Sequence, residues 1–325
     1  MLARKKVGKS GVEISEIILG CWVMGGERWG GADDEESIRA IHKAIDLGMN
    51  TFDTAEAYNN GYSENIIGRA IKDRGNDVVI SSKVGENHMR HDDVIAACER
   101  SLKRLGRDHI DIYFLHWPAG YYGGPKASLA ETMGAMAELQ KAGKIRAIGM
   151  SNFSRVEFEE AKKTVRVDIY QPPFNILWRR TSTDLFPYCI ENDIAIIPYS
   201  PIAQGLLSGK FKPGHIFKEG DSRGTTPLFQ SGPMERALAL NEKIKPIADK
   251  QGKTLAQLAI RWVCQFPGVT APIAGGRSPA QVEENSGGVG WNLSKEDFDF
   301  IEQLSRDYHK QLPKFKHYFD TEIVK

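Results

Sequence analysis

Short apolar runs alternate with longer amphipathic segments over most of the chain. The runs predict eight strands, at residues 15–20, 50–53, 78–83, 110–116, 145–151, 168–171, 195–198 and 270–273. Several are apolar throughout, which is typical of parallel strands buried on both faces. Each strand is followed by a segment with helical spacing of its apolar residues, and Ser154 and Glu157 have capping-box spacing at the start of one of them.

Repeated strand–helix units occur in two kinds of parallel sheet, a closed (β/α)8 TIM barrel and an open doubly wound sheet. The count of eight units in 325 residues favours the barrel. No G-x-G-x-x-G follows the first strand, which argues against a dinucleotide-binding doubly wound sheet. We therefore predict an α/β fold, a (β/α)8 TIM barrel, as a single domain over residues 1–325.

Two segments add to the repeating pattern. Residues 5–7 and 12–14 flank Gly8-Lys9-Ser10-Gly11, which predicts an N-terminal β-hairpin. About seventy residues separate the seventh strand from the eighth, with a Gly/Pro/Lys-rich loop at 209–233 and helices at 235–251 and 255–266. A loop of that length inside a compact domain is usually functional, for example as a lid.

Composition narrows the class of partner. The chain has 43 basic and 42 acidic residues, so its net charge would not attract nucleic acid or an anionic membrane. A small-molecule partner is therefore expected. Its four cysteines lie far apart without metal-ligand spacing, as in proteins of a reducing compartment. Without a signal-like N-terminus or a long apolar run, a cytoplasmic protein is expected.

Polar side chains stand at the ends of three consecutive predicted strands. Asp53, Lys83 and His116 end the second, third and fourth strands, and Tyr58 lies on the loop after the second. Strand C-termini meet at one mouth of a barrel, where barrel enzymes place their active sites. There Asp53 can keep Lys83 protonated, and the charge of Lys83 can lower the phenol pKa of Tyr58 from about 10. His116 can donate a hydrogen bond to a carbonyl oxygen as it becomes an alkoxide.

Each of these residues also has a plainer interpretation. Asp53 and Lys83 can form a structural ion pair at the barrel rim, Tyr58 can be an exposed tyrosine, and His116 can be a core histidine. An isomerase or aldolase that uses Lys83 as a Schiff-base nucleophile is disfavoured, because Asp53 would keep the amine charged. The combination at matching strand ends favours a proton-transfer site.

Six longer motifs agree with this site: FDTAEAYNNGYSE, LKRLGRDHIDIYFLHWP, GKIRAIGMSNFS, YQPPFNIL, PYSPIAQGLLSGKF and APIAGGRSPAQVEEN. With them the chain resembles the aldo-keto reductase family, whose Asp, Tyr, Lys, His tetrad falls on Asp53, Tyr58, Lys83 and His116. The GLLSGKF segment and the following loop are most similar to the bacterial, general-stress-protein-like branch. The resemblance implies an NADPH-dependent reductase of aldehydes or ketones with Tyr58 as general acid. It also leaves an alternative, a cofactor-sensing binding subunit such as the potassium-channel β subunits of the same family.

The resemblance further implies NADP(H) bound across the barrel mouth without a Rossmann motif. Ser151, Asn152 and Gln171 would hold the nicotinamide carboxamide, and Tyr199 would stack on the ring. The other implied cofactor contacts are Gly20, Cys21, Trp22 and Asp53 near the first two strands; Ser200, Pro201, Ile202, Ala203, Gln204, Gly205, Leu206 and Lys210 around the pyrophosphate; and Gly275, Gly276, Arg277, Ser278, Gln281 and Asn285 toward the adenosine end. Arg277 and Arg223 would favour the 2′-phosphate of NADP(H).

The adenosine end departs from the family pattern. The usual Pro-Gly-Ala-Arg is Ala274-Gly275-Gly276-Arg277 here, with no second basic residue after it, and Gln281 stands where many relatives carry arginine. NAD(H) is therefore the less favoured alternative to NADP(H). We expect a small carbonyl or alcohol substrate, no metal, and a monomer or weak homo-oligomer. The expected substrate-pocket residues are Trp22, Tyr58, His116, Trp117 and Trp178, with Tyr121 and Tyr122 nearby; ordinary packing is the alternative for each aromatic.

Overall fold

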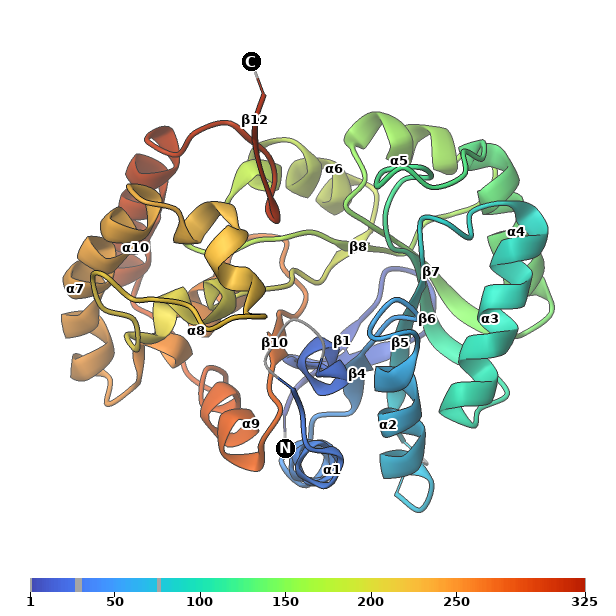
Figure 1. Ribbon diagram of the computed structural model, residues 1–325, viewed down its shortest axis with the longest axis horizontal. Coiled ribbons are helices and arrows are strands. Elements are labelled where there is room, and N and C mark those ends of the chain that lie inside the picture. The colour runs from blue at the N-terminus through green and yellow to red at the C-terminus, as the bar shows by residue number, and fades with distance from the viewer. Residues whose placement is uncertain (1, 27–30, 75–76, 325) are drawn as a thin grey trace.

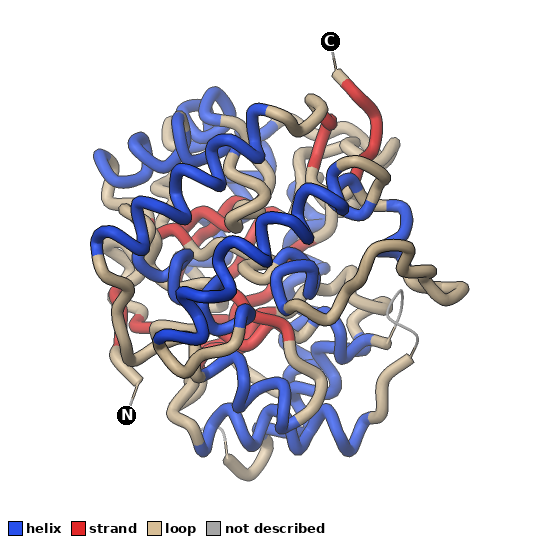
Figure 2. The backbone as a smooth tube through the Cα atoms, turned by 90° about the vertical axis from the view of Figure 1, so that its left-hand side faces the viewer, coloured by secondary structure: helices blue, strands red, loops and turns tan. Residues whose placement is uncertain are grey.

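The computed structural model describes residues 2–26, 31–74 and 77–324. Its central sheet has eight parallel strands in the order β10-β3-β4-β5-β6-β7-β8-β9. In sequence order they are β3 (Ile18–Gly20), β4 (Thr51–Asp53), β5 (Val79–Val84), β6 (Ile110–Leu115), β7 (Ile145–Ser151), β8 (Ile169–Gln171), β9 (Ala195–Ile196) and β10 (Ile273–Gly275). Figure 2 shows these strands inside a layer of helices. The predicted (β/α)8 barrel is confirmed.

The barrel closes between β9 and β10 through single parallel bridges instead of a continuous ladder. Ile196 pairs with Val269, and Tyr199 pairs with Ile273. Two backbone hydrogen bonds run across this seam, from Thr270 N to Ile196 O at 2.8 Å and from Ile273 N to Pro198 O at 2.8 Å. The seventh predicted strand, at 195–198, is therefore correctly located but shorter than expected, whereas the eighth, predicted at 270–273, lies further along the chain at Ile273–Gly275.

Helices surround the barrel on the outside (Figure 1). They are α1 (Asp34–Asp46), α2 (Tyr62–Ile71), α3 (His91–Leu105), α4 (Leu129–Lys141), α5 (Arg155–Ala161), α6 (Leu185–Glu191), α7 (Pro233–Lys250), α8 (Leu255–Gln265), α9 (Pro279–Ser286) and α10 (Lys295–Lys310). The capping box of Ser154 and Glu157 is present at α5. Side-chain caps of this kind satisfy backbone N–H groups that have no partner within the helix.

The N-terminal hairpin closes the end of the barrel at which the strands begin. Strand β1 (Arg4–Lys6) pairs antiparallel with β2 (Glu13–Ser15). Val7 and Val12 belong to the apolar cluster that fills the barrel interior. At the turn, Gly8 has φ +49°, and a Cβ there would lie 2.7 Å from Asp193 O and 2.8 Å from Asp168 O. Only glycine allows the turn to approach these carbonyls, just ahead of β9 and β8.

The connection from β9 to β10 forms the predicted long insertion. Besides α7 and α8 it contains three short 3-10 helices, η3 (Ala203–Ser208), η4 (Ser222–Thr225) and η5 (Pro227–Phe229). The loop of residues 209–233 has a small aromatic core, in which Phe211 lies 5.4 Å from Phe229 and 5.9 Å from Phe217 between ring centroids. The loop is thus packed against itself as well as against the barrel.

The chain ends in a second antiparallel hairpin that the hydrophobic pattern does not predict. It consists of β11 (Phe315–His317) and β12 (Asp320–Ile323). Phe315 and Tyr318 are buried, whereas Ile323 is exposed. In Figure 1 the hairpin stands above the centre of the molecule, between α10 and α6.

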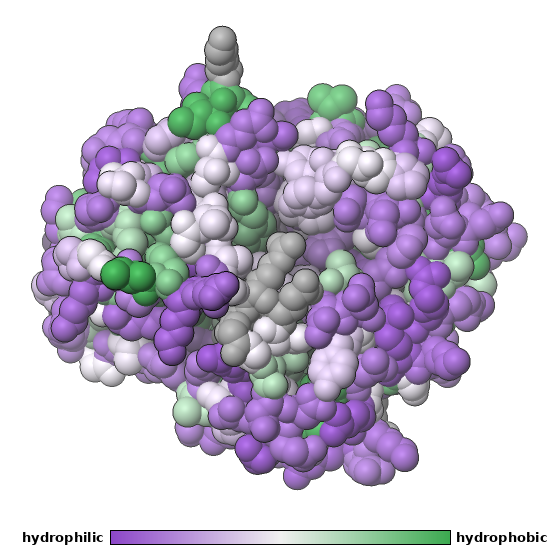
Figure 3. Space-filling view, viewed as in Figure 1, coloured by the Kyte–Doolittle hydropathy of each residue, from purple (hydrophilic) through white to green (hydrophobic). Residues whose placement is uncertain are grey.

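Most of the surface in Figure 3 is hydrophilic, with apolar residues in separate small groups, one of them at the top of the view near the C-terminal hairpin. Within the described ranges, no helix has the length and apolar character needed to cross a bilayer.

Candidate active site

The ends of β4, β5 and β6 bring three of the predicted catalytic residues to one mouth of the barrel. Asp53 is the last residue of β4, Lys83 lies next to the end of β5, and His116 follows β6 directly. The pairing continues past the strands, because Thr54 N donates to Ser81 O at 2.8 Å and His116 N donates to Val84 O at 3.0 Å. Tyr58 lies in the turn after β4, and its ring centroid is 5.7 Å from that of His116.

Lys83 is the centre of this group and has no exposed side-chain surface. Its Nζ donates to Asp53 Oδ1 at 2.7 Å, to Thr54 O at 2.6 Å and to Tyr58 Oη at 3.3 Å. An ammonium has three donors, and each of them has an acceptor here. Lys83 is therefore held as a cation, which is the wrong state for a Schiff-base nucleophile.

Asp53 is fixed by groups other than Lys83. Its Oδ2 accepts from Ser81 Oγ at 2.7 Å and from Gln171 Nε2 at 2.9 Å. Ser81 was not among the predicted site residues, although its position two residues before Lys83 puts it on the same face of β5. Gln171, which the family resemblance assigns to the nicotinamide carboxamide, also supports the carboxylate.

The pKa of Tyr58 corrects one expectation. Desolvation of the phenol raises its pKa above the ordinary value, and the opposing effect of the Lys83 charge only partly offsets this. For Lys83, burial alone would lower the pKa, but Asp53 and Tyr58 outweigh it and the pKa is raised. The sequence predicts that Lys83 is charged, but it does not show how deeply the hydroxyl of Tyr58 is buried. At neutral pH, Tyr58 keeps its proton beside an ammonium.

His116 is electrically neutral at this site. Burial and, second, the charge of Lys83 hold the pKa of its imidazole well below the usual value. Its Nδ1 is buried and has no hydrogen-bond partner among the described residues. A neutral imidazole beside Tyr58 can therefore donate one hydrogen bond into the mouth without a competing charge.

Residues predicted to contact the nicotinamide form one hydrogen-bonded group beside the tetrad. Asn152 has φ +66°, and its Nδ2 donates to His116 O at 3.0 Å and to Ser151 Oγ at 3.1 Å. Its Oδ1 accepts from Tyr199 Oη at 2.9 Å. Ser151 Oγ donates to Gln171 O at 2.8 Å. The structure thus brings all four predicted contacts together.

The C-terminal hairpin adds residues that the sequence reasoning missed. His317 Nε2 lies 3.2 Å from Asn152 Oδ1, and the ring of Phe319 lies parallel to that of Tyr199 at 5.9 Å between centroids. Phe319 also meets Trp22 edge-on at 5.6 Å. The available signal was the alternation of buried Phe315 with exposed Lys316 in a short segment, which is weak by itself.

The predicted aromatic pocket residues fall into two sets. Trp22 stacks on Tyr58 at 6.0 Å, and Trp117 lies 4.7 Å from Tyr121 and 5.1 Å from Tyr122. These rings surround the mouth together with the C-terminal hairpin. Trp178 is buried and meets the ring of Tyr318 edge-on at 5.3 Å. Tyr318 in turn packs edge-on against Tyr199, so Trp178 contacts a residue that packs against Tyr199.

The predicted pyrophosphate segment has an unusual backbone. Ser200, Ala203, Gln204 and Gly205 all have positive φ. A Cβ on Gly205 would lie 2.9 Å from Lys210 Nζ, so the ammonium sits directly over this glycine. Left-handed residues turn successive N–H groups to one side and form concave anion sites. The segment and Lys210 together fit a phosphate group.

Arg223 comes from the insertion loop to the same segment. Its Nη1 donates to Gln204 O at 3.4 Å, and its other nitrogens bind Asp221, with Nη2 2.5 Å from Asp221 Oδ2. The loop of residues 209–233 is thereby tied to the predicted cofactor segment.

The residues predicted for the adenosine end meet at the start of α9, which Ser278 caps. Arg277 N donates to Gln281 Oε1 at 3.0 Å, and Arg277 Nη1 donates to Gly31 O at 3.1 Å. Asn285 Nδ2 donates to Gly275 O at 3.0 Å. A helix N-terminus with an adjacent guanidinium suits an anionic group.

Close packing at the first strand explains two further predicted positions. A Cβ on Gly20 would lie 2.9 Å from Ile273 Cγ2, across the β3–β10 pair. Cys21 N donates to Asp53 O at 2.8 Å, and its thiol is buried with a strongly raised pKa, chiefly from desolvation. Burial therefore disfavours the reactive thiolate form of Cys21. Within the described part of the chain, no three His, Cys, Asp or Glu side chains group as metal ligands.

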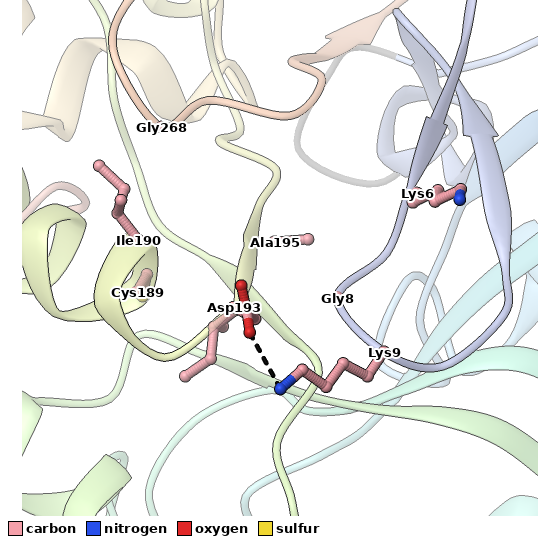
Figure 4. A pocket seen from close by; sticks show the side chains of 9 residues that line it. Lys6, Gly8, Lys9, Cys189, Ile190, Asp193, Ala195 and Gly268 are labelled. Atoms are coloured by element: carbon pink, nitrogen blue, oxygen red, sulfur yellow. Dashed lines mark ion pairs between the residues drawn. The ribbon is translucent and has the colours of Figure 1, made fainter.

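A hollow of about 300 Å³ lies at the opposite end of the barrel, beside the N-terminal hairpin (Figure 4). Lys6, Lys9, Ile190 and Asp193 are among its lining residues, and Lys9 and Asp193 form an exposed ion pair at 3.0 Å. None of the predicted site residues lines it.

The chain is similar to known proteins over most of its length. Residues 16–306 match the model of the aldo/keto reductase family. The aldo-keto reductase YhdN of Bacillus subtilis is 37% identical over 90% of this chain and 90% of its own length. An NADH-specific methylglyoxal reductase of Escherichia coli is 30% identical over 92% of this chain and 97% of its own.

Solved structures show the same fold. A glycerol dehydrogenase from Gluconobacter oxydans is 31% identical, with a TM-score of 0.85 over 94% of this chain and 95% of its own. An aldo/keto reductase from Klebsiella pneumoniae, in complex with NADP and acetate, is 29% identical, with a TM-score of 0.75 over 98% of this chain and 99% of its own. The family match and the identity to YhdN both extend over most of the sequence, and the chain belongs to the aldo/keto reductase family of oxidoreductases.

Proposed function

We propose that this protein is an NADP(H)-dependent reductase of aldehydes or ketones, with Tyr58 as its general acid. The observation that carries the proposal is the hydrogen-bonded series Asp53–Lys83–Tyr58, in which a buried ammonium lies 3.3 Å from a protonated phenol. This series lies beside His116, whose imidazole is neutral and whose buried Nδ1 has no hydrogen-bond partner among the described residues.

The roles follow from the charges. As a carbonyl oxygen gains negative charge, Tyr58 gives it a proton, and the ammonium of Lys83 stabilises the phenolate that remains. Asp53 holds Lys83 protonated and pointed at Tyr58. His116 donates a hydrogen bond to the same oxygen and orients it. The bound nicotinamide would supply the hydride to the carbonyl carbon.

Side chains of the mouth fit a dinucleotide in an extended position. Ser151, Asn152, Gln171 and Tyr199 would hold the nicotinamide, with Asn152 and Gln171 exchanging some of their present hydrogen bonds for the carboxamide. Gly205 and Lys210 would hold the pyrophosphate. Arg277 favours the 2′-phosphate of NADP(H). The methylglyoxal reductase of Escherichia coli is NADH-specific, so relatives with a preference for NADH also exist.

The test is reduction of 4-nitrobenzaldehyde, followed by loss of NADPH absorbance, in the wild type and in Tyr58→Phe. Loss of a positioned general acid lowers the rate by about a hundredfold to ten-thousandfold. Removal of one hydroxyl leaves ring packing in place, so NADPH binding, measured by fluorescence, remains. Equal rates in the two proteins would contradict the assignment of Tyr58. Tight NADPH binding without turnover in the wild type would favour a cofactor-sensing subunit.

A further inference from the structure

The chain turns in an unusual way directly after Tyr58. Asn59, Asn60 and Gly61 have φ of +49°, +52° and +82°, so three consecutive residues are left-handed. Asparagine and glycine adopt this conformation most readily, but it costs other residues about 1 to 2 kcal/mol each. The turn is closed by hydrogen bonds from Tyr62 N to Asn59 O at 3.0 Å and from Asn59 Nδ2 to Gly25 O at 2.8 Å.

Arg104, from the far end of α3, packs against this turn. A Cβ on Gly61 would lie 2.2 Å from its Nε and 2.5 Å from its Cζ, so the guanidinium occupies the space that any other residue at 61 would need. Arg104 is itself fixed, since its Nε donates to Glu64 Oε2 at 2.6 Å. The carboxylate of Glu64 has no exposed surface, which makes this a buried interaction.

Glu64 connects the turn to the strand that carries Lys83. Its second oxygen, Oε1, accepts from Ser82 Oγ at 2.6 Å, and Ser82 precedes Lys83 in β5. One buried carboxylate therefore contacts both sides of the Tyr58–Lys83 pair, β5 directly and the turn through Arg104. The first turn of α2 is held from another side, where Ser63 Oγ donates to Cys21 O at 2.9 Å.

We propose that Arg104 and Glu64 are positioning residues for the reaction, which set the separation of Tyr58 from Lys83 by bracing the left-handed turn at residues 59–61 against β5. Neither side chain touches the reacting atoms. The inference rests on the proposed role of Tyr58, and it assigns to a pair on the outside of the barrel a function in catalysis beyond that of joining α2 to α3.

The main test compares Arg104→Gln and Gly61→Ala with the wild type in single-turnover reduction of 4-nitrobenzaldehyde by NADPH. Misplacement of a catalytic group by about 1 Å costs on the order of a hundredfold, so we expect a fall of about tenfold to a hundredfold, with the Kd for NADPH unchanged. Gly61→Ala keeps both charged partners, but its Cβ collides with the Arg104 guanidinium and so disturbs the contact between Arg104 and the turn. It decides the question if Arg104→Gln fails to fold, as judged by circular dichroism.

A pH profile separates positioning from support of the fold. Tyr58 must hold its proton, so kcat/KM falls at alkaline pH, and the Lys83 charge lowers the pH at which this happens. In both variants Tyr58 is less close to Lys83, and the alkaline fall moves to higher pH. Arg104→Lys, which keeps a cation for Glu64, recovers part of the rate. A merely structural pair gives a lower Tm with the rate and the alkaline fall at wild-type values, which would overturn the proposal.

Two further variants serve as controls. Arg69→Gln, in α2, removes another arginine, which binds Asp34 and Glu35 at the surface, and it should leave rate and profile unchanged. Tyr58→Phe keeps this inference distinct from the proposed function. A fully active Tyr58→Phe contradicts the proposed function itself. An inactive Tyr58→Phe beside fully active Arg104→Gln and Gly61→Ala contradicts only the positioning role.

Discussion

The two ends of the barrel mouth are built in different ways. At the proton-transfer end, Lys83 and Asp53 are 0% and 4% exposed, and their charges meet inside a complete set of hydrogen bonds. At the proposed phosphate end, the cations Lys210, Arg223 and Arg277 lie in the long insertion and just before α9, and all three retain exposed surface. The first arrangement is fixed by the strands before anything binds, whereas the second holds its charges where solvent or a ligand can reach them.

This difference agrees with the two roles proposed above, a reaction step at one end and recognition of the cofactor at the other. Charges without water around them interact strongly and keep one geometry, which suits a reaction step. Exposed cations interact weakly until a ligand excludes water, which suits recognition. Changes at the first end should therefore alter stability and rate together, and changes at the second should alter binding alone.

The largest expected effect is that of Asp53→Asn. It leaves the Lys83 ammonium buried without a counter-charge, and breaking a buried pair in this way costs about 3 to 5 kcal/mol of the free energy of unfolding. Urea denaturation measures that loss. The aldehyde-reduction rate should fall as well, because Lys83 is no longer held toward Tyr58. A variant of wild-type stability would show that Lys83 loses its proton easily and that the pair is not the fixed element described here.

A smaller and more selective effect is expected for Arg277→Ala. A hydrogen bond to a charged group contributes about 1.5 to 3 kcal/mol, so the Kd for NADPH should rise by about tenfold to a hundredfold. Binding of NADH, the Tm and the single-turnover rate at saturating NADPH should not change. Arg306→Ala, which removes an exposed partner of Glu302, is the matched control. An equal loss for NADH and NADPH would contradict recognition of the 2′-phosphate.

The effect that is smallest at neutral pH concerns the C-terminal hairpin, because it appears only as the pH falls. Burial lowers the pKa of His317 from 6.5 to about 3. The unfolded chain then binds a proton that the folded chain does not, so stability is lost as the pH falls from about 6.5 toward about 3, by at most about 1.4 kcal/mol per pH unit. In Tm measurements across this range, His317→Gln should show a shallower fall than the wild type. Parallel curves would mean that His317 is protonated in the folded protein.

The strand ends of the active site could be predicted from the sequence, because each apolar run stops at a residue that is costly to bury alone. Asp53 and Lys83 need each other there, and parallel strands leave both at one mouth. The same local reasoning could not give the net pKa of Tyr58. That value depends on how deeply the phenol lies, and depth is decided by Trp22, His116 and the rest of the assembled mouth.

The remaining features were hidden for different reasons. Asn59-Asn60-Gly61 shows in its composition that it can be left-handed, but Arg104, which packs on it, lies more than forty residues further along the chain. The C-terminal hairpin has strands of three and four residues, too short for a clear alternation. It contacts Asn152 and Tyr199, which the family resemblance assigns to the cofactor, so these two residues gave no indication of a hairpin.

The N-terminal hairpin also constrains how the chain folds during synthesis. Its turn at Gly8 rests on the carbonyls of Asp168 and Asp193, and β3, the first strand of the barrel, pairs with β10, the last. Residues made first therefore complete their contacts only after most of the chain has left the ribosome. Contacts so distant in sequence form slowly, and until then the apolar side chains of the hairpin and of β3 lack their final partners. The N-terminal hairpin and β3 are thus exposed to misassembly while the rest of the chain is being made.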